Sequence, residues 1–241
     1  MSDPKRKVEA LISRIEKGEI APDKAWVKIG SMKNEYVALL TKYYPHIKNA
    51  EQSWHTYIGN KFQQLIYSIL KGYVDRLKIK DTCFRSLLVL KESEIKKNDI
   101  ISRKLAIRYG DYFLLPDTDL AIVDYSFEDS WKSKILAIIS CKTSLRERIA
   151  QACYWKLKLL SSDATKHIKV FLASTDNDRD FVIDDTRRES FQGKSRNRII
   201  SEYELDGVYL LREDFRDEWE SNKVKSYDHV FDDIIQIFKK G

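Results

Sequence analysis

The sequence is poor in residues that cross-link, break or anchor a chain. Among its 241 residues there are three cysteines, four prolines and eight glycines. The cysteines, Cys83, Cys141 and Cys153, are odd in number and show no paired spacing, which argues against a disulfide framework and against a zinc cluster. No apolar run approaches the roughly 18 residues of a membrane span, the charged N-terminal segment has no apolar signal core, and a glycine-rich phosphate loop is missing. We therefore expect a cytoplasmic protein that uses neither a membrane nor a nucleotide cofactor.

The composition otherwise suits a folded protein with a basic surface. Hydrophobic residues make up 43% of the chain, aromatic residues 12% and charged residues 33%, which provides a core and argues against long disordered stretches. The net charge of +6 favours a polyanionic partner such as nucleic acid. The length fits one large domain, or a domain with a small subdomain.

Residues 1–50 carry helical signals and no strand signal. Asp3 can cap a helix whose apolar residues recur at helical spacing, and further helices are expected from about Pro22 and over 32–43. We predict a helical subdomain over 1–50 and the main domain over 51–241. The subdomain fits dimerisation, contact with DNA, or a helical flap packed on the main core.

The rest of the chain alternates between helical and strand patterns. Helices are expected over 51–74, 145–160 and 228–239, and strands over 87–90, 120–123, 135–139, 170–173 and 208–211. The polar segment 175–197 is expected to be a surface loop. This order predicts an α/β fold with a central sheet and helices on both of its faces.

Two aspartates precede the strand expected over 120–123. Asp117 follows the turn at Pro116, and Asp119 comes directly before the apolar run. A carboxylate at the mouth of a strand reaches solvent from a fixed backbone, which suits a hard cation such as Mg²⁺. We predict Asp119 as a metal ligand, with Asp117 as the second candidate. The alternative is that both are turn residues that satisfy backbone N–H groups.

The strand expected over 135–139 continues into Ser140, Cys141 and Lys142. Alternation puts Leu136, Ser140 and Lys142 on one face and Cys141 on the other, where it is expected to pack in the core. A lysine at this place can orient a water molecule or offset charge on a phosphate. A solvated surface lysine is the alternative.

A basic helix start follows this strand. Ser144 and Glu147 fit the S-x-x-E capping box, which puts Arg146 and Arg148 in the first helical turn. The helix dipole disfavours cations there, so their presence favours a functional role. Arginine can bind the edge of guanine and a carboxylate can accept a hydrogen bond from cytosine, so Arg146, Glu147 and Arg148 are candidate readers of G·C pairs. A solvated helix end is the alternative.

In this order, the pieces resemble the PD-(D/E)xK nuclease core. The run CKTSLRERIAQ resembles the type II restriction endonucleases that recognise CCGG and interrupted CC-GG sites, and within that group it is most similar to the BsaWI type, which cleaves W/CCGGW. The resemblance covers residues 116–151.

The resemblance implies a catalytic nuclease domain over 51–241 and a set of roles. Asp119 or Asp117 would hold the metal, Lys142 would be the catalytic lysine, and residues 146–148 would read bases. Mg²⁺ is the implied cofactor and double-stranded DNA the implied substrate. A homodimer is implied as well, because palindromic sites are read by two-fold assemblies.

One position departs from the pattern. Ser140 occupies the place of the acid in D/E-x-K, a variation that some members of the group share, and we keep it among the candidate catalytic residues. Such relatives take the missing acid from the next helix, where this chain has Trp155 and Lys156. The second acid is therefore unassigned: Glu147 is one option and the helix over 51–74 is another, although the polar residues there are Gln63 and Gln64.

We therefore expect a Mg²⁺-dependent type II restriction endonuclease that hydrolyses phosphodiesters in a G·C-containing palindrome such as CCGG. Two alternatives stay open. One is a structure-specific repair or junction nuclease on the same core, and the other is a DNA-binding module without catalysis.

Overall fold

The computed structural model describes residues 3–44, 49–145, 148–186 and 191–240. Its helices are α1 (Pro4–Glu16), α2 (Pro22–Ser31), α3 (Lys33–Tyr43), α4 (Ala50–Lys80), α5 (Glu92–Lys97), α6 (Asp99–Leu105), α7 (Arg148–Leu160), α8 (Arg196–Glu204) and α9 (His229–Lys240), with short 3₁₀ helices η1 (Thr82–Ser86), η2 (Ser130–Lys132) and η3 (Asp217–Trp219). Its strands are β1 (Leu87–Lys91), β2 (Ile107–Tyr109), β3 (Tyr112–Leu114), β4 (Leu120–Asp124), β5 (Lys134–Lys142), β6 (Lys169–Ser174), β7 (Gly207–Leu210) and β8 (Val224–Ser226).

Six of these strands form one mixed sheet in the order β1-β4-β5-β6-β7-β8. Strands β1, β4 and β5 are antiparallel neighbours, whereas β5, β6, β7 and β8 run parallel to one another. The expected α/β fold with a central sheet is therefore confirmed, and the sheet is a mixed one. The other two strands, β2 and β3, form a separate hairpin that turns at Gly110, whose φ is +61°.

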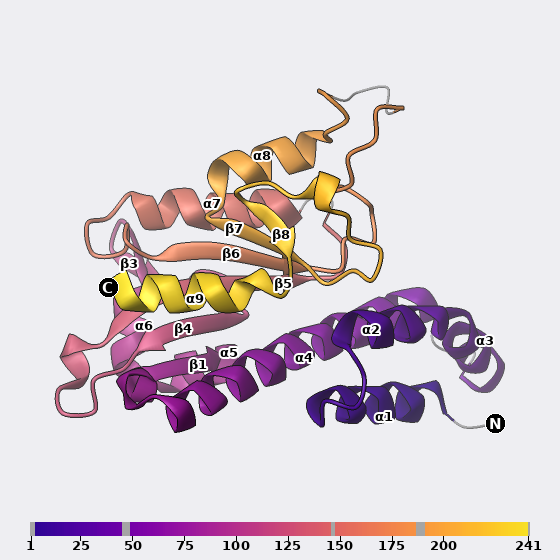
Figure 1. Cartoon of the computed structure of the whole chain (residues 1–241), viewed down its shortest axis with the longest axis horizontal. Helices are drawn as coiled ribbons and strands as arrows, with labels where there is room; N and C mark the ends of the chain where they lie inside the picture. The colour runs from indigo at the N-terminus through magenta and orange to yellow at the C-terminus, as the bar shows by residue number, and fades with distance from the viewer. Residues whose placement is uncertain (1–2, 45–48, 146–147, 187–190, 241) are drawn as a thin grey trace.

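Helices cover both faces of the sheet, as Figure 1 shows. One face packs against α4 and α9 through an apolar cluster that includes Phe62, Ile122 and Ile139 and that continues from α4 into the N-terminal helices. The other face packs against α5, α6 and α7 through a second cluster that includes Val123 and Leu172. Alternate residues of the central strands enter the two clusters, which explains why these strands are apolar along their whole length.

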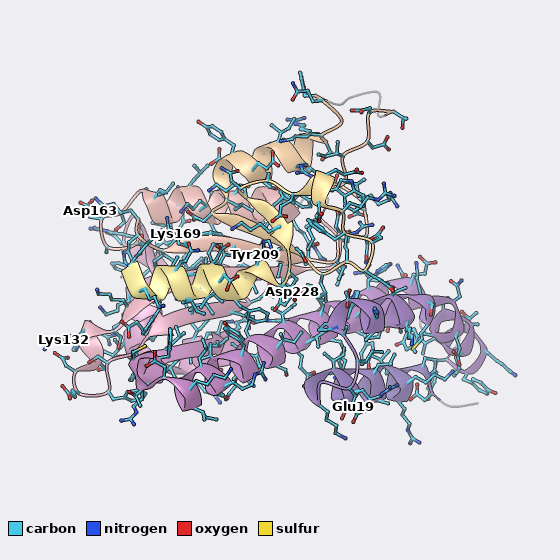
Figure 2. The ribbon with its side chains drawn as sticks, viewed as in Figure 1. Glu19, Lys132, Asp163, Lys169, Tyr209 and Asp228 are labelled. Carbon is cyan, nitrogen blue, oxygen red and sulfur yellow. The ribbon has the colours of Figure 1, made fainter. Side chains whose placement is uncertain are left out.

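Helix α9 is also held to the sheet by polar contacts. The hydroxyl of Tyr209 on β7 donates to Asp233 of α9 at 2.7 Å, and Figure 2 shows Tyr209 between the sheet and this helix. Lys225 of β8 lies 2.7 Å from the same carboxylate. The buried tyrosine thus keeps a partner for its hydroxyl, which burial would otherwise make costly.

The N-terminal helices pack against the first half of α4. The side chain of Asp3 caps α1 by accepting from the backbone N–H of Lys5 at 3.0 Å, and Pro4 occupies the first helical position. The rings of Trp26 on α2 and Phe62 on α4 have centroids 5.0 Å apart. The ring centroids of Tyr36 on α3 and Trp54 on α4 are also 5.0 Å apart, and all three helices share one apolar cluster with α4. The boundary at residue 50 stays a prediction.

Strand β5 contains a bulge that the alternation did not predict. Ile122 of β4 lies opposite Ala137, but Val123 lies opposite Ile135, so Leu136 is the extra residue. Leu136 therefore joins Ala137 in the same apolar cluster, and the expected placement of Leu136 on the face of Lys142 is wrong. Beyond the bulge the alternation is regular and leaves Cys141 in the core.

The segment 175–197 is more than a surface loop. Asp176 and Phe181 are fully buried, and helix α8 begins at Arg196. None of the helices in the described ranges combines the length and apolar character that crossing a bilayer requires.

Candidate active site

The start of β4 and the end of β5 lie side by side and bring three predicted residues together. The two strands are antiparallel with Leu120 opposite Ile139, so Asp119, just before β4, lies next to the last residues of β5. The ammonium Nζ of Lys142 is 3.2 Å from Oδ2 of Asp119 and 3.8 Å from Oδ2 of Asp117. Two carboxylates and one lysine therefore share one edge of the sheet.

Asp119 is the more buried of the two carboxylates and the more firmly held. Its Oδ2 accepts the backbone N–H of Cys141 at 2.6 Å, in addition to the lysine. Its backbone carbonyl accepts from the Glu92 N–H at 3.1 Å and from the Gln63 side chain at 3.4 Å. Burial raises the pKa of Asp119, while the positive charge of Lys142 and the N–H of Cys141 act in the opposite direction. The carboxylate is thus fixed in place next to a cation.

Asp117 is more open to solvent and is held from the other side. Its side chain is 43% exposed, against 14% for Asp119. Its Oδ2 accepts from Nε2 of Gln151 on α7 at 2.8 Å. Helix α7 therefore contacts the acidic turn directly, and Gln151 joins the site although the sequence offered no signal beyond a polar residue near the helix start.

A polar cavity of about 350 Å³ opens in front of these groups, between α4 and the ends of β4 and β5. Its lining comes from α4, from the acidic turn, from the end of β5 and from α7. The residues are Gln52, His55, Thr56, Gly59, Asn60, Gln63, Asp117, Asp119, Cys141, Lys142, Thr143, Arg148 and Gln151. A phosphate group that entered it would meet the lysine and both aspartates.

Ser140 and Cys141 contribute differently from these charged residues. Ser140 is 8% exposed and does not line the cavity within the described part of the chain. Burial raises the pKa of the Cys141 thiol well above its ordinary value, and the side chain packs in the apolar cluster, which fits its expected role as a packing residue. A serine hydroxyl also cannot supply the charge of the acid that it replaces.

The positions at which relatives recover the acid have structural roles here. Lys156 is buried and lies 2.5 Å from the carboxylate of Asp206. Trp155 is half-buried against the second apolar cluster. On α4 the amide of Gln63 donates to the backbone carbonyl of Asp119, and it carries no charge. Of the acids considered for the second ligand, Glu147 lies outside the described residues.

The predicted base readers are described in part. Arg146 and Glu147 lie outside the described residues, and Arg148 is exposed at the first residue of α7, where it lines the cavity. The predicted capping box includes Glu147 and so also lies partly outside the described residues. The hydroxyl of Ser144 donates to Asp178 at 2.6 Å, a contact that the sequence did not indicate.

The donor chemistry fits a hard cation. Asp117 and Asp119 offer carboxylate oxygens beside a polar cavity, and Mg²⁺ is commonly held by one or two carboxylates together with substrate phosphates and water. Within the described residues, no three side chains of His, Cys, Asp or Glu form a ready-made metal group. A cation here would therefore take part of its shell from outside the protein.

Comparisons with known proteins agree on type II restriction enzymes. Residues 91–233 match the family model described as BsaWI restriction endonuclease type 2. The chain is 43% identical over 195 residues to MjaVIP of Methanocaldococcus jannaschii, assigned as a type II restriction enzyme, and the match covers 80% of each chain. It is 36% identical over 137 residues to HpyAORF263P of Helicobacter pylori, assigned likewise, with 56% of this chain and 67% of that protein covered.

The fold has a counterpart among solved structures. Restriction endonuclease PspGI, solved in a complex with substrate DNA, is similar with a TM-score of 0.54 and 15% sequence identity, and the match covers 100% of this chain and 95% of that one. At this identity the likeness concerns the fold.

Proposed function

The chain belongs to the BsaWI family of type II restriction endonucleases, and from this premise we propose that it cuts double-stranded DNA at a G·C-containing palindrome such as CCGG, with Mg²⁺ as cofactor. The family assignment favours this function over a junction nuclease or a DNA-binding module without catalysis. The observation that carries the proposed chemistry is the convergence of Lys142, Asp119 and Asp117 at the mouth of one cavity.

Asp119 and Asp117 would hold the cation. Asp119 is suited to this because Cys141 N–H and the neighbouring strands fix its position, and Asp117 because its carboxylate is accessible from the cavity. A bound Mg²⁺ supplies charge neutralisation at the phosphate and makes a water molecule more acidic. Gln151 would keep Asp117 turned toward the site through its 2.8 Å hydrogen bond.

Lys142 would act on the attacking water and on the phosphate. Its side chain is 12% exposed, and its Nζ lies between the two carboxylates, so its position is largely fixed before substrate binds. A positioned ammonium can donate to an attacking water and stabilise the negative charge that develops on the phosphate oxygens. Ser140, which is buried and is not among the described residues that line the cavity, would support the strand end and leave the charge chemistry to the aspartates.

Residues 146–148 would read the DNA sequence. Arginine can donate two hydrogen bonds to guanine O6 and N7, and glutamate can accept from cytosine N4, so Arg146, Glu147 and Arg148 suit G·C pairs. Arg148 supports this assignment because it is exposed at the start of α7 and lines the cavity of Lys142. Because both strands of a palindrome present the same sequence, a homodimer would place one such site on each strand.

Cleavage of phage DNA of known sequence tests the proposal. We expect discrete fragments in Mg²⁺, none in EDTA, and fragment ends that map to one palindrome. Lys142→Met should abolish cutting while DNA binding persists. Lys132→Met is the matched control. Lys132 is 78% exposed and precedes the first residue of β5, whereas Lys142 is the last residue of that strand (Figure 2).

Two results would contradict the proposal: a smear of random fragments, or full activity of the Lys142 variant. Arg148→Ala should weaken recognition by about 1–3 kcal/mol at one base pair. An equal loss on every sequence would instead identify Arg148 as a phosphate contact.

A further inference from the structure

The loop after β6 is bonded to the turn that follows Lys142. Strands β5 and β6 are parallel, with Lys142 opposite Ser174, so the chain leaves both strands at the same edge of the sheet. The carbonyl of Thr143 accepts from the hydroxyl of Thr175 at 3.1 Å and from the N–H of Asn177 at 3.3 Å. The two loops therefore run together directly beyond the catalytic lysine.

The strongest contact between the two loops comes from one carboxylate oxygen. Oδ2 of Asp178 accepts from the hydroxyl of Ser144 at 2.6 Å and from the backbone N–H of Leu145 at 2.8 Å. The Leu145 side chain is buried, so the turn is held by its backbone from one side and by core packing from the other. The charge on the acceptor strengthens both hydrogen bonds.

Asp178 stands on a loop that is itself firmly held. The neighbouring Asp176 is fully buried and accepts from the N–H groups of Asp180 at 2.7 Å and Phe181 at 3.2 Å, and from Arg212 at 3.1 Å. Asp176 adopts a φ of +48°, a conformation uncommon for a residue with a side chain. Such strained backbone persists where surrounding contacts over-determine it, and it gathers at functional sites.

From these contacts we propose that Asp178 is a positioning residue that fixes the turn Thr143–Leu145 and so sets the direction in which Arg148, whose backbone N–H donates to the Leu145 carbonyl at 2.6 Å, meets DNA. The turn joins Lys142 to the start of α7, and a base reader must be held to a fraction of an ångström to distinguish base edges. The proposal rests on the base-reading role given to residues 146–148 under the proposed function. The proposal adds that the carboxylate of Asp178, which lies outside residues 146–148, makes the recognition of bases selective.

Base discrimination separates this role from a merely structural one. A residue that only stabilises the fold affects cleavage of all sequences alike. A residue that aims base readers affects the ratio of kcat/KM between the mapped site and duplexes with one base pair changed. We expect Asp178→Ala to lower this ratio about tenfold, which corresponds to about 1.4 kcal/mol.

A double-mutant cycle with Ser144→Ala tests whether Asp178 acts through the turn. Ser144→Ala alone removes one of the two hydrogen bonds and should lower the ratio less than Asp178→Ala, but in the Asp178→Ala background it should add almost nothing. Asp163→Ala is the matched control. Asp163 is 95% exposed and pairs with Lys166. It follows the last residue of α7, whereas Arg148 is the first residue of that helix (Figure 2).

Unchanged discrimination in Asp178→Ala, additive effects in the cycle, or an equal loss on all duplexes would each overturn the proposal. If Asp178→Ala does not fold, Asp178→Asn and Ser144→Ala carry the same comparison, and folding is checked by thermal unfolding of each variant. Digestion of DNA by the wild type distinguishes failure of the proposed function from failure of the role given to Asp178. If the wild type does not cut at a defined palindrome, the proposed function fails; if it does and the variants discriminate normally, only the role of Asp178 fails.

Discussion

Replacing the buried Asp176 with asparagine should change how the stability of the protein depends on pH. Burial raises the pKa of Asp176 from 3.8 to about 6, and the N–H of Phe181 and the charge of Arg212 offset only part of this effect. The folded state therefore holds a proton on this carboxyl more tightly than the unfolded state does. Consequently the carboxyl's contribution to stability is greatest below pH 3.8 and declines as the pH rises to about 6.

The size of this decline follows from the two pKa values. A difference of about two pKa units corresponds to roughly 3 kcal/mol over the whole range, because one unit is worth about 1.4 kcal/mol. Between pH 5 and pH 7 the share is about 1.3 kcal/mol, since part of the decline has already occurred below pH 5. Asparagine does not titrate, so its own contribution to stability should be the same at each pH, and the difference between the two proteins should follow the titration of Asp176.

Urea unfolding of both proteins at pH 5, 6 and 7 measures the effect. The free energy of unfolding of the wild type minus that of Asp176→Asn should fall by about 1.3 kcal/mol from pH 5 to pH 7. Asp206→Asn is the control: burial opposes its ionisation, but Lys156 and the Val170 N–H lower the net pKa of Asp206, so its difference should stay flat in this range. A difference for Asp176 that is flat or grows with pH would show that Arg212 keeps this carboxylate ionised, and would refute the reasoning.

Three other predictions concern single groups. Asp206→Ala should destabilise the fold by about 3–5 kcal/mol in urea unfolding, because it leaves the buried ammonium of Lys156 without its 2.5 Å partner; a change below 1 kcal/mol would contradict this. Gly193→Ala should cost about 1–2 kcal/mol or more, because Gly193 has a φ of +74° and a Cβ there would come within 2.7 Å of the Asp185 and Ile183 side chains. Asp119→Asn should raise the Mg²⁺ concentration needed for half-maximal cleavage while circular dichroism stays unchanged, and an unaltered Mg²⁺ dependence would remove Asp119 from the cation site.

The elements that the sequence predicted are those with long, regular patterns. The apolar runs that became β4, β5, β6 and β7 are continuous because both faces of each strand are covered, and the long helix α4 has its stripe on one side. Strand β8 has three residues and the hairpin strands β2 and β3 also have three each, too few for a period to be visible. The bulge at Leu136 depends on pairing with β4, which no local pattern contains.

The central part of the candidate site was predicted for a similar reason. Asp117, Asp119 and Lys142 lie at strand ends, and an antiparallel pair brings such ends together whatever the rest of the fold does. Gln151 and Asp178 were not predicted as partners of the site. Their contacts join residues 34 positions apart in each case, Gln151 with Asp117 and Asp178 with Ser144, and depend on how α7 and the loop after β6 settle on the sheet.

The missing second acid shows that a catalytic motif depends on which side chains meet in the folded structure, and that residue spacing in the sequence alone does not identify them. Ser140 is buried, and Lys156 is committed to Asp206, so neither the strand position nor the next helix supplies a carboxylate in the described core. The two carboxylates of the cavity are balanced by the ammonium of Lys142 and the guanidinium of Arg148, so the cavity has no excess negative charge to hold a cation by itself. A hard cation that prefers six oxygen ligands must then draw several of them from water and from the phosphate of the DNA. The cation and the DNA are therefore expected to strengthen each other's binding. Cleavage would then depend on a DNA sequence that fits the contacts made by α7 and the turn before it, because only such DNA places its phosphate next to the cation.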